Sequence, residues 1–273
     1  MPGDDGFERY LNILGVADAR VDLNTLRRLV RAQLTRVPFE NVSKLHLARS
    51  KDLRGVPALD LYLDGIENCR FGGTCYSNNH HLASLLRYVG FDTSYCGADM
   101  VSGPDVHAVV IVRLENREYL VDAGYGAPFY EPMPRDRDEP LTIRLGRNRY
   151  VLQPRDDRGR SQMEHHREGR QIHGYLAKPT PRDLAFFHRV VLDSYRPSAS
   201  FMTRLRIARF LDDGNVELLN DQLVQARDDA YSVESIADRA ALVDAIVEHF
   251  GMPRSIVCEV VDELDWPPRV EVG

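Results

Sequence analysis

The 273-residue chain has few lysines and no long apolar run, and each scarcity excludes a class of protein. Only Lys44, Lys51 and Lys178 are lysines, and 41 acidic residues outnumber the 35 basic ones to give a net charge of -6. A nucleic-acid-binding protein needs a basic excess or a basic stripe to neutralise phosphates, so we expect no nucleic-acid partner. The longest uninterrupted apolar run lies within Ala108 to Val112, far short of the roughly 20 residues of a membrane span, so we expect no membrane partner.

Cysteine is also scarce, and the four cysteines show no CxxC spacing: they are Cys69, Cys75, Cys96 and Cys258. This number is too small to staple a chain of this length, so we expect free thiols, no structural zinc and no metal cofactor. Residues 1–10 lack the basic region and apolar core of a secretory signal, and we therefore expect a cytoplasmic protein. Three of the cysteines are predicted to be packing residues, whereas Cys75 has a different environment.

Hydrophobic periodicity divides the chain into three blocks. Two amphipathic helices are predicted in the first ninety residues, one capped by Asn24 and stopped by Pro38, the other following the Gly72-Gly73 pair and ending at Gly90. The middle third is predicted to be rich in strands, with a solvated hairpin or loop over the highly charged stretch 155–170; the predicted strands are 93–97, 106–114, 118–122, 141–145, 150–153 and 172–176.

The last third is predicted to mix helices and strands. A helix is expected after Pro181 and through Asp193, and another over 236–250, where Gly251 ends it. Strands are expected near 201–210 and 216–219. No low-complexity linker separates the blocks, so we expect any domains to pack tightly against one another.

Cys75 follows paired glycines at the predicted start of a helix. At such a position the chain turns sharply and the backbone N–H groups of the first helical turn lack partners within the helix. The positive end of the helix dipole and a neighbouring imidazolium both favour a thiolate. The pattern therefore predicts a reactive cysteine that needs a base and an orienting acid.

His107 and Asp122 are the polar residues in two apolar strands that surround Glu115-Asn116. If Glu115 and Asn116 form a two-residue turn, Asp122 lies opposite Val109 and diagonal to His107 on one sheet face, within side-chain reach. Taken alone, such residues are more often structural than catalytic. Together, the order Cys, His, Asp fits nucleophilic acyl transfer, in which a carboxylate orients the histidine that deprotonates the thiol.

The motifs around these residues resemble those of the arylamine N-acetyltransferases. The resemblance rests on Val37-Pro38-Phe39-Glu40-Asn41, Gly72-Gly73-Thr74-Cys75, His107, Val121-Asp122-Ala123-Gly124-Tyr125-Gly126 and, farther on, Pro197-Ser198-Ala199-Ser200-Phe201. It implies an α+β fold of the transglutaminase-like type in three domains, a helical domain (1–90), a β-barrel domain (91–190) and an inter-domain segment with an α/β lid (191–273).

The resemblance also implies a ping-pong reaction without a metal. Cys75 would take an acetyl group from acetyl-CoA and pass it to an arylamine, arylhydrazine or N-hydroxyarylamine, with His107 moving the protons and Asp122 orienting it. Gly124 and Gly126 are expected to bind the CoA.

Val37, Phe39 and Phe129 are expected to bind the acceptor by the same resemblance. Phe129 occupies the third glycine position of a GxGxxG fingerprint, so a dinucleotide fold is not expected. The alternative for the loop after Asp122 is a tight turn with one aromatic plug.

Two positions depart from the family pattern, which usually has Arg before the paired glycines and Glu two residues after the cysteine, where this chain has Phe71 and Ser77. Glu40 therefore lacks its usual arginine, and we expect either a substitute partner, such as Arg70 or Arg36, or a shifted pKa.

Two alternatives share these motifs. One is a related amide synthase that uses a polyketide or other acyl thioester, and the other is a weakly active protein that binds CoA or an aromatic ligand.

Overall fold

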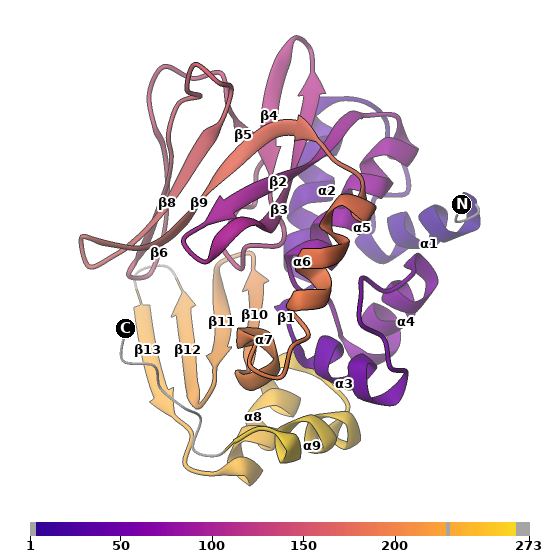
Figure 1. The fold of residues 1–273 in the computed structure, drawn as a ribbon, viewed down its shortest axis with the longest axis vertical. Helices are drawn as coiled ribbons and strands as arrows, with labels where there is room; N and C mark the ends of the chain where they lie inside the picture. The colour runs from indigo at the N-terminus through magenta and orange to yellow at the C-terminus, as the bar shows by residue number, and fades with distance from the viewer. Residues whose placement is uncertain (1–3, 228–229, 266–273) are drawn as a thin grey trace.

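The computed structural model describes residues 4–227 and 230–265. They form a helical part, a part built on a large sheet and a part that mixes strands and helices (Figure 1). Helices dominate the first part, with one two-residue strand among them: α1 (Asp4–Leu14), α2 (Leu23–Arg36), β1 (Phe39–Glu40), α3 (Val42–Ser50), α4 (Leu59–Cys69) and α5 (Cys75–Val89). The largest core cluster packs α1, α2, α4 and α5 against one face of the neighbouring sheet. Helix α5 is thereby packed between the other helices and the sheet.

The two predicted helices of this part are present, with one cap corrected. The N-cap of α2 is Asp22 and not Asn24, because the Asp22 carboxylate accepts a hydrogen bond from the Thr25 N–H at 2.7 Å. At the other end of the part, Gly90 closes α5 with a φ of 108°, a conformation that favours glycine, as the sequence predicts.

The middle of the chain forms an eight-stranded antiparallel sheet in the order β5-β4-β3-β2-β9-β8-β7-β6. Its strands are β2 (Asp92–Met100), β3 (Gly103–Leu114), β4 (Arg117–Val121), β5 (Met133–Pro134), β6 (Leu141–Leu145), β7 (Asn148–Leu152), β8 (Ser161–Arg167) and β9 (Arg170–Pro181). The sheet curves like a barrel around a cluster that includes Tyr125, Phe129, Tyr150 and Tyr175.

The prediction of a solvated hairpin or loop over 155–170 is confirmed as to the hairpin, since β8 pairs with β9 around Glu168 and Gly169, but it is wrong in that β8 is partly buried. Ser161, Met163 and His165 point inward and are buried, while the residues between them are half-buried. Buried and half-buried residues therefore alternate along the strand. Hydrophobicity alone does not reveal this alternation, because serine and histidine occupy two of the inward positions.

The last part contains a five-stranded sheet and two helices, which lie at the bottom of Figure 1. The strands are β10 (Arg206–Leu211), β11 (Gly214–Leu219), β12 (Gln222–Arg227) and β13 (Ala230–Ser235), and the helices are α8 (Arg239–Phe250) and α9 (Arg254–Glu263). The fifth strand is β1, which pairs with β10, so the last sheet is joined directly to the segment that precedes α3.

The connection to this last part consists of η1 (Leu184–Phe187), α6 (His188–Asp193) and α7 (Ser200–Thr203). The helix expected through Asp193 and the helix ended by Gly251 are confirmed. The strand expected near 201–210 is wrong in its first half, because α7 occupies it. The sequence patterns also missed β12, β13 and α9.

The fold class predicted from the sequence, α+β with a helical first part, a barrel-like sheet and an α/β last part, is confirmed. The domain boundaries at 90/91 and 190/191 stay predictions, and residues 1–3, 228–229 and 266–273 of the first and third predicted domains lie outside the described residues. Across the described ranges, every helix is too short or too polar to cross a membrane.

Candidate active site

Cys75 is the first residue of α5 and is buried, with 7% of its surface exposed. The turn that leads into it requires glycine, because a Cβ atom on Gly72 would lie 2.0 Å from the carbonyl oxygen of Pro38. Thr74 caps the helix with an extended backbone and makes no side-chain capping bond. The backbone donors of the first turn therefore stay available beside the Cys75 sulfur.

The β3–β4 hairpin brings His107 and Asp122 together. Glu115 and Asn116 both have positive φ values, 52° and 62°, as a tight two-residue turn requires, and the resulting ladder pairs Val110 with Val121. This is the predicted register, and it places Asp122 diagonal to His107. The His107 Nε2 atom lies 2.8 Å from the Asp122 Oδ2 atom, with both side chains almost fully buried.

Asn79 completes this arrangement and was missed by the sequence analysis. Its Nδ2 atom donates to Asp122 Oδ1 at 2.8 Å and to the Ala108 carbonyl at 2.6 Å, and its Oδ1 atom accepts from the Ala123 N–H at 2.8 Å. Asn79 lies four residues after Cys75, and therefore on the same face of α5. This spacing is the signal that could have identified it.

His107 and Asp122 each favour the charged form of the other. Burial lowers the pKa of His107, but the negative charge of Asp122 and hydrogen bonds with Asp122 and Cys75 outweigh it and raise this pKa to about 10. Burial likewise opposes ionisation of Asp122, but His107, Asn79 and the Gly124 N–H hold the pKa of Asp122 below its ordinary value. At neutral pH His107 is thus an imidazolium, which favours a thiolate at Cys75.

Gly124 brings the loop after β4 against the nucleophile. A Cβ atom at this position would lie 2.5 Å from Cys75 Cα and 2.7 Å from Asn79 Nδ2. Its N–H donates to Asp122 Oδ1 at 2.9 Å. Only glycine allows this approach, so the close packing of the loop on α5 explains the residue without any ligand.

The other residues predicted to bind ligands are packed in the protein interior. Gly126 has a φ of 73° and packs against the Phe39 ring, and Phe129 is stacked on Tyr125 with ring centroids 5.9 Å apart. Val37, Phe39 and Phe129 are all at least 96% buried. Phe129 therefore forms part of the aromatic filling of the barrel, and the ligand-binding roles of these residues stay predictions.

Glu40 has partners other than those expected. Its Oε1 atom accepts from the Gly72 N–H at 3.0 Å and its Oε2 atom from the Ser43 N–H at 2.8 Å. Arg36 instead donates to the Ile13 carbonyl, and Arg70 caps α4 in a left-handed conformation, so the prediction that one of them replaces the missing arginine is wrong.

Glu40 nevertheless has substitute partners and a shifted pKa, as expected, although none of the partners is a cation. Backbone N–H groups at the start of α3 and ahead of α5 satisfy the Glu40 oxygens instead. Burial raises the pKa of Glu40 in spite of these bonds.

The histidines of β8 point to opposite sides of the strand. His165 Nε2 contacts Asn148 Oδ1 at 2.9 Å, whereas His166 Nε2 contacts Glu164 Oε2 at 2.9 Å. Within residues 4–227 and 230–265, no group of three or more His, Cys, Asp or Glu side chains could hold a metal ion.

Comparison with known proteins agrees with this geometry. A family model described as N-acetyltransferase matches residues 22–256. The arylamine N-acetyltransferase of Mycolicibacterium smegmatis is 27% identical over 286 residues, which cover 94% of this chain and 97% of that protein. Arylamine N-acetyltransferase 2 of Mesocricetus auratus is 32% identical over 137 residues, which cover 46% of each chain.

The match thus spans about half the length of the Mesocricetus auratus and Mus musculus proteins. Among solved structures, Mycobacterium marinum arylamine N-acetyltransferase in complex with CoA has a TM-score of 0.79 at 21% identity, over 95% of this chain and all of that one. This likeness shows the shared fold. Since the family model matches most of the sequence, the chain belongs to the arylamine N-acetyltransferase family.

Proposed function

We propose that this protein is an acetyl-CoA-dependent arylamine N-acetyltransferase, with Cys75 as the nucleophile. The proposal rests on one observation above all: an imidazole held 2.8 Å from a buried carboxylate, with a pKa raised by that carboxylate and by a cysteine at a helix N-terminus. That combination suits a cysteine nucleophile and supplies a proton donor beside it.

In the first half-reaction, the Cys75 thiolate attacks the carbonyl carbon of acetyl-CoA. The negative charge that develops on the carbonyl oxygen is stabilised by backbone N–H groups, that of Cys75 among them. The bond between the acetyl carbon and the CoA sulfur then breaks as the His107 imidazolium gives its proton to that sulfur. The products are free CoA, an acetyl thioester on Cys75 and a neutral His107.

In the second half-reaction, the nitrogen of the amine attacks the thioester carbon. Neutral His107 accepts the proton that the nitrogen loses, the new C–N bond forms and the bond to the Cys75 sulfur breaks. The thiolate and the imidazolium are thereby restored. Throughout both steps Asp122 holds the imidazole ring in one orientation and balances its charge.

The acceptors in this proposal are arylamines, arylhydrazines and N-hydroxyarylamines. Gly124 and Gly126 border the CoA, while Val37, Phe39 and Phe129 face the aromatic acceptor. The CoA in the Mycobacterium marinum structure supports the choice of acyl donor. We also propose a cytoplasmic enzyme that acts on foreign aromatic amines, and the free state of all four cysteines supports a reducing compartment.

Intact-mass spectrometry tests the first half-reaction. Wild-type protein mixed with acetyl-CoA should gain the mass of one acetyl group, and neither Cys75→Ser nor His107→Ala should gain it. Wild-type protein that stays unmodified would overturn the proposal. Acylation by a longer acyl thioester but not by acetyl-CoA would favour an amide synthase, and ligand binding without acylation would favour a binding protein.

A further inference from the structure

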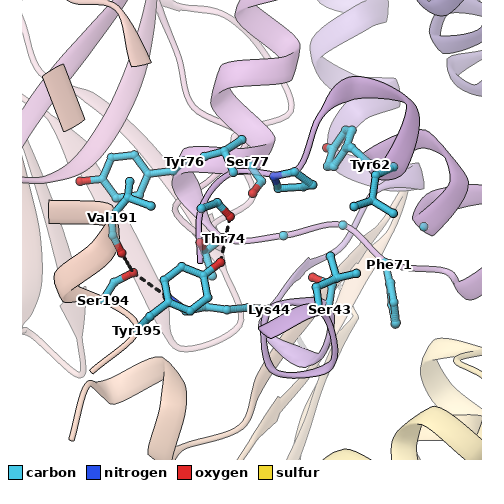
Figure 2. A pocket seen from close by; sticks show the side chains of 18 residues that line it. Ser43, Lys44, Tyr62, Phe71, Thr74, Tyr76, Ser77, Val191, Ser194 and Tyr195 are labelled. Atoms are coloured by element: carbon cyan, nitrogen blue, oxygen red, sulfur yellow. Dashed lines mark hydrogen bonds between the residues drawn. The ribbon is translucent and has the colours of Figure 1, made fainter. Parts of the chain in front are cut away.

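Tyr76, the residue after Cys75, contacts the strand that carries His107. Its side chain is buried, with 6% of the residue's surface exposed, and forms part of the wall of a cavity beside the start of α5. Figure 2 shows its ring beside Val191. The Tyr76 hydroxyl donates a hydrogen bond to the backbone carbonyl of Asp105 in β3. A direct contact therefore joins the first turn of α5 to β3.

This contact is one of two hydrogen bonds that α5 side chains donate to β3 around His107. Asn79 donates to the carbonyl of Ala108, the residue after His107, at 2.6 Å. Tyr76 donates to the carbonyl of Asp105, two residues before it. Tyr76 and Asn79 are three positions apart and lie on the same face of the helix. The two bonds therefore fix β3 relative to α5 on both sides of His107.

Asp105 is held in place by the strands around it. Its φ of 54° lies in the left-handed region, which residues other than glycine adopt only rarely. Its N–H donates to Asp99 Oδ1 at 2.9 Å, and Lys178 Nζ of β9 lies 2.6 Å from both Asp99 Oδ1 and Asp105 Oδ1. A Cβ atom on Gly97 would lie 1.9 Å from Asp105 Oδ1, so the carboxylate packs directly on β2. The hydroxyl of Tyr76 thus binds a fixed carbonyl.

The ring of Tyr76 is held in place as well. Phe187 of η1 packs against Tyr76 and Tyr95, with ring centroids 5.5 Å and 5.2 Å away. The Tyr95 hydroxyl donates to the Tyr76 carbonyl at 3.4 Å. Because all three side chains are buried and close-packed, the Tyr76 ring acts as a spacer of constant length between α5 and β3.

A spacer at this place matters because Cys75 and His107 belong to different parts of the fold. Cys75 begins α5, whereas His107 lies in the large sheet, so contacts between the helix and the sheet decide how far apart the two residues are. Proton transfer needs hydrogen-bonding distance, and a misplacement of about 1 Å can lower a catalysed rate by about 100-fold.

We propose that Tyr76 is a positioning residue for the acyl-transfer reaction: its hydrogen bond to the Asp105 carbonyl sets the distance between Cys75 on α5 and His107 on β3. Tyr76 acts through these two residues and touches no substrate. The inference rests on the proposed function in taking Cys75 as the nucleophile and His107 as its base. A phenylalanine would fill the same space but would leave β3 without this bond on one side of His107.

The test compares Tyr76→Phe with Tyr195→Phe in the whole protein. Tyr195 is the matched control, because it is also buried, lines the same cavity and donates its hydroxyl to a backbone carbonyl, that of Gly55 at 2.9 Å. The two variants should lose similar stability in chemical denaturation. Only Tyr76→Phe should lower kcat for acetyl transfer, by about tenfold or more, with KM for acetyl-CoA unchanged.

A folded Tyr76→Phe protein with the wild-type kcat would overturn the role of Tyr76, and so would an equal fall of kcat in Tyr195→Phe. Lys178→Met tests the same contact from the side of the sheet if Tyr76→Phe does not fold. Asp105 then loses its cation while Tyr76 is intact, so kcat should fall with KM unchanged. A folded Lys178→Met protein with an unchanged kcat would likewise overturn the proposal.

Alkylation of Cys75 by iodoacetamide separates this inference from the proposed function, since it needs neither acetyl-CoA nor an amine. At pH 7 Tyr76→Phe should react about tenfold more slowly than the wild type, because His107 no longer lies where it favours the thiolate; at pH 10, where the thiol ionises unaided, the rates should be equal. A slower variant of a protein that acetyl-CoA never acylates would preserve the role of Tyr76 and reject the proposed function. Acylation of the wild type, with equal alkylation rates for wild type and variant at pH 7, would do the opposite.

Discussion

Asp122 and Glu40 are both fully buried carboxylates near the start of α5, but their surroundings have opposite effects on their charge. Asp122 accepts hydrogen bonds from a side-chain amide and a backbone N–H and lies against the imidazole of His107, and its pKa is lowered. Glu40 accepts from the backbone N–H groups of Ser43 and Gly72 and has no imidazole beside it, and burial raises its pKa. Burial is the same for both, so the partners decide which carboxylate is held as an anion.

The two carboxylates therefore have different roles. The Asp122 anion can stabilise an imidazolium and fix the orientation of its ring, which a catalytic base requires. Glu40 joins the first turn of α3 to Gly72, which fixes the path of the chain just before Cys75. Asp122 therefore sets the charge of the site, whereas Glu40 fixes its backbone geometry.

The largest expected effect comes from Asp122→Asn. The variant should fold, because the amide is isosteric, but the turnover number should fall by about 10³–10⁴-fold since His107 loses its counter-charge and its fixed tautomer. Steady-state acetylation kinetics, with circular dichroism as the check on folding, measure this. Near-normal turnover would show that Asp122 has no part in the mechanism. Its role would then not differ from the structural role of Glu40.

A smaller effect is expected from Gly124→Ala, which disturbs the donors of Asp122 without changing its charge. The new methyl group would meet Cys75 Cα and Asn79 Nδ2, and relief of this overlap should cost about 1–3 kcal/mol of stability. Gly55→Ala is the matched control, since no atom lies within 4 Å of its Cβ position. Equal unfolding free energies for the two variants would contradict the close packing of this loop on α5.

The smallest expected effect is that of Glu40→Gln on stability, and it should depend on pH. Below an ordinary pKa of 4.5 wild-type Glu40 is neutral and the amide should be less stable by about 1 kcal/mol, because its NH₂ group faces a backbone donor. The folded pKa lies above the unfolded value, so the wild type loses stability as pH rises from 4.5 through the raised pKa.

The deficit of the Glu40→Gln variant should therefore shrink with rising pH, which chemical denaturation at pH 4 and pH 8 would measure. Asp122 has the opposite sign, since its pKa is lowered: its contribution is present above the ordinary value of 3.8 and is lost as pH falls through the folded pKa. A deficit for Glu40→Gln that grows with pH would show that Glu40 is held as an anion, as Asp122 is.

The sequence predicted the contact of His107 with Asp122 and the place of Cys75 at the start of a helix because each signal is local. Paired glycines precede a helix, and a two-residue turn fixes which residues of a hairpin share a face. The partners of Glu40 and the contact of Tyr76 with Asp105 could not be predicted in the same way. They depend on segments far apart in the sequence, such as α5 and β3, which the fold alone brings together.

Several elements of the third part of the fold were also missed, for a related reason. Strands β12 and β13 carry several polar residues on a sheet that is partly exposed, so their apolar pattern is weak. The short helix α7 stands where a strand pattern begins, and its position follows from packing rather than from its own four residues.

Transfer from an isolated acyl-enzyme is the most direct test of Cys75 as the residue that carries the acetyl group. Protein treated with acetyl-CoA and freed of excess donor should carry one acetyl group on Cys75. Mixed with a panel of arylamines and arylhydrazines, it should lose that group in a single turnover and release an equal amount of N-acetylated product. An acetyl group found on another residue, or one that stays on Cys75 with every acceptor, would show that Cys75 does not carry the acetyl group to the amine.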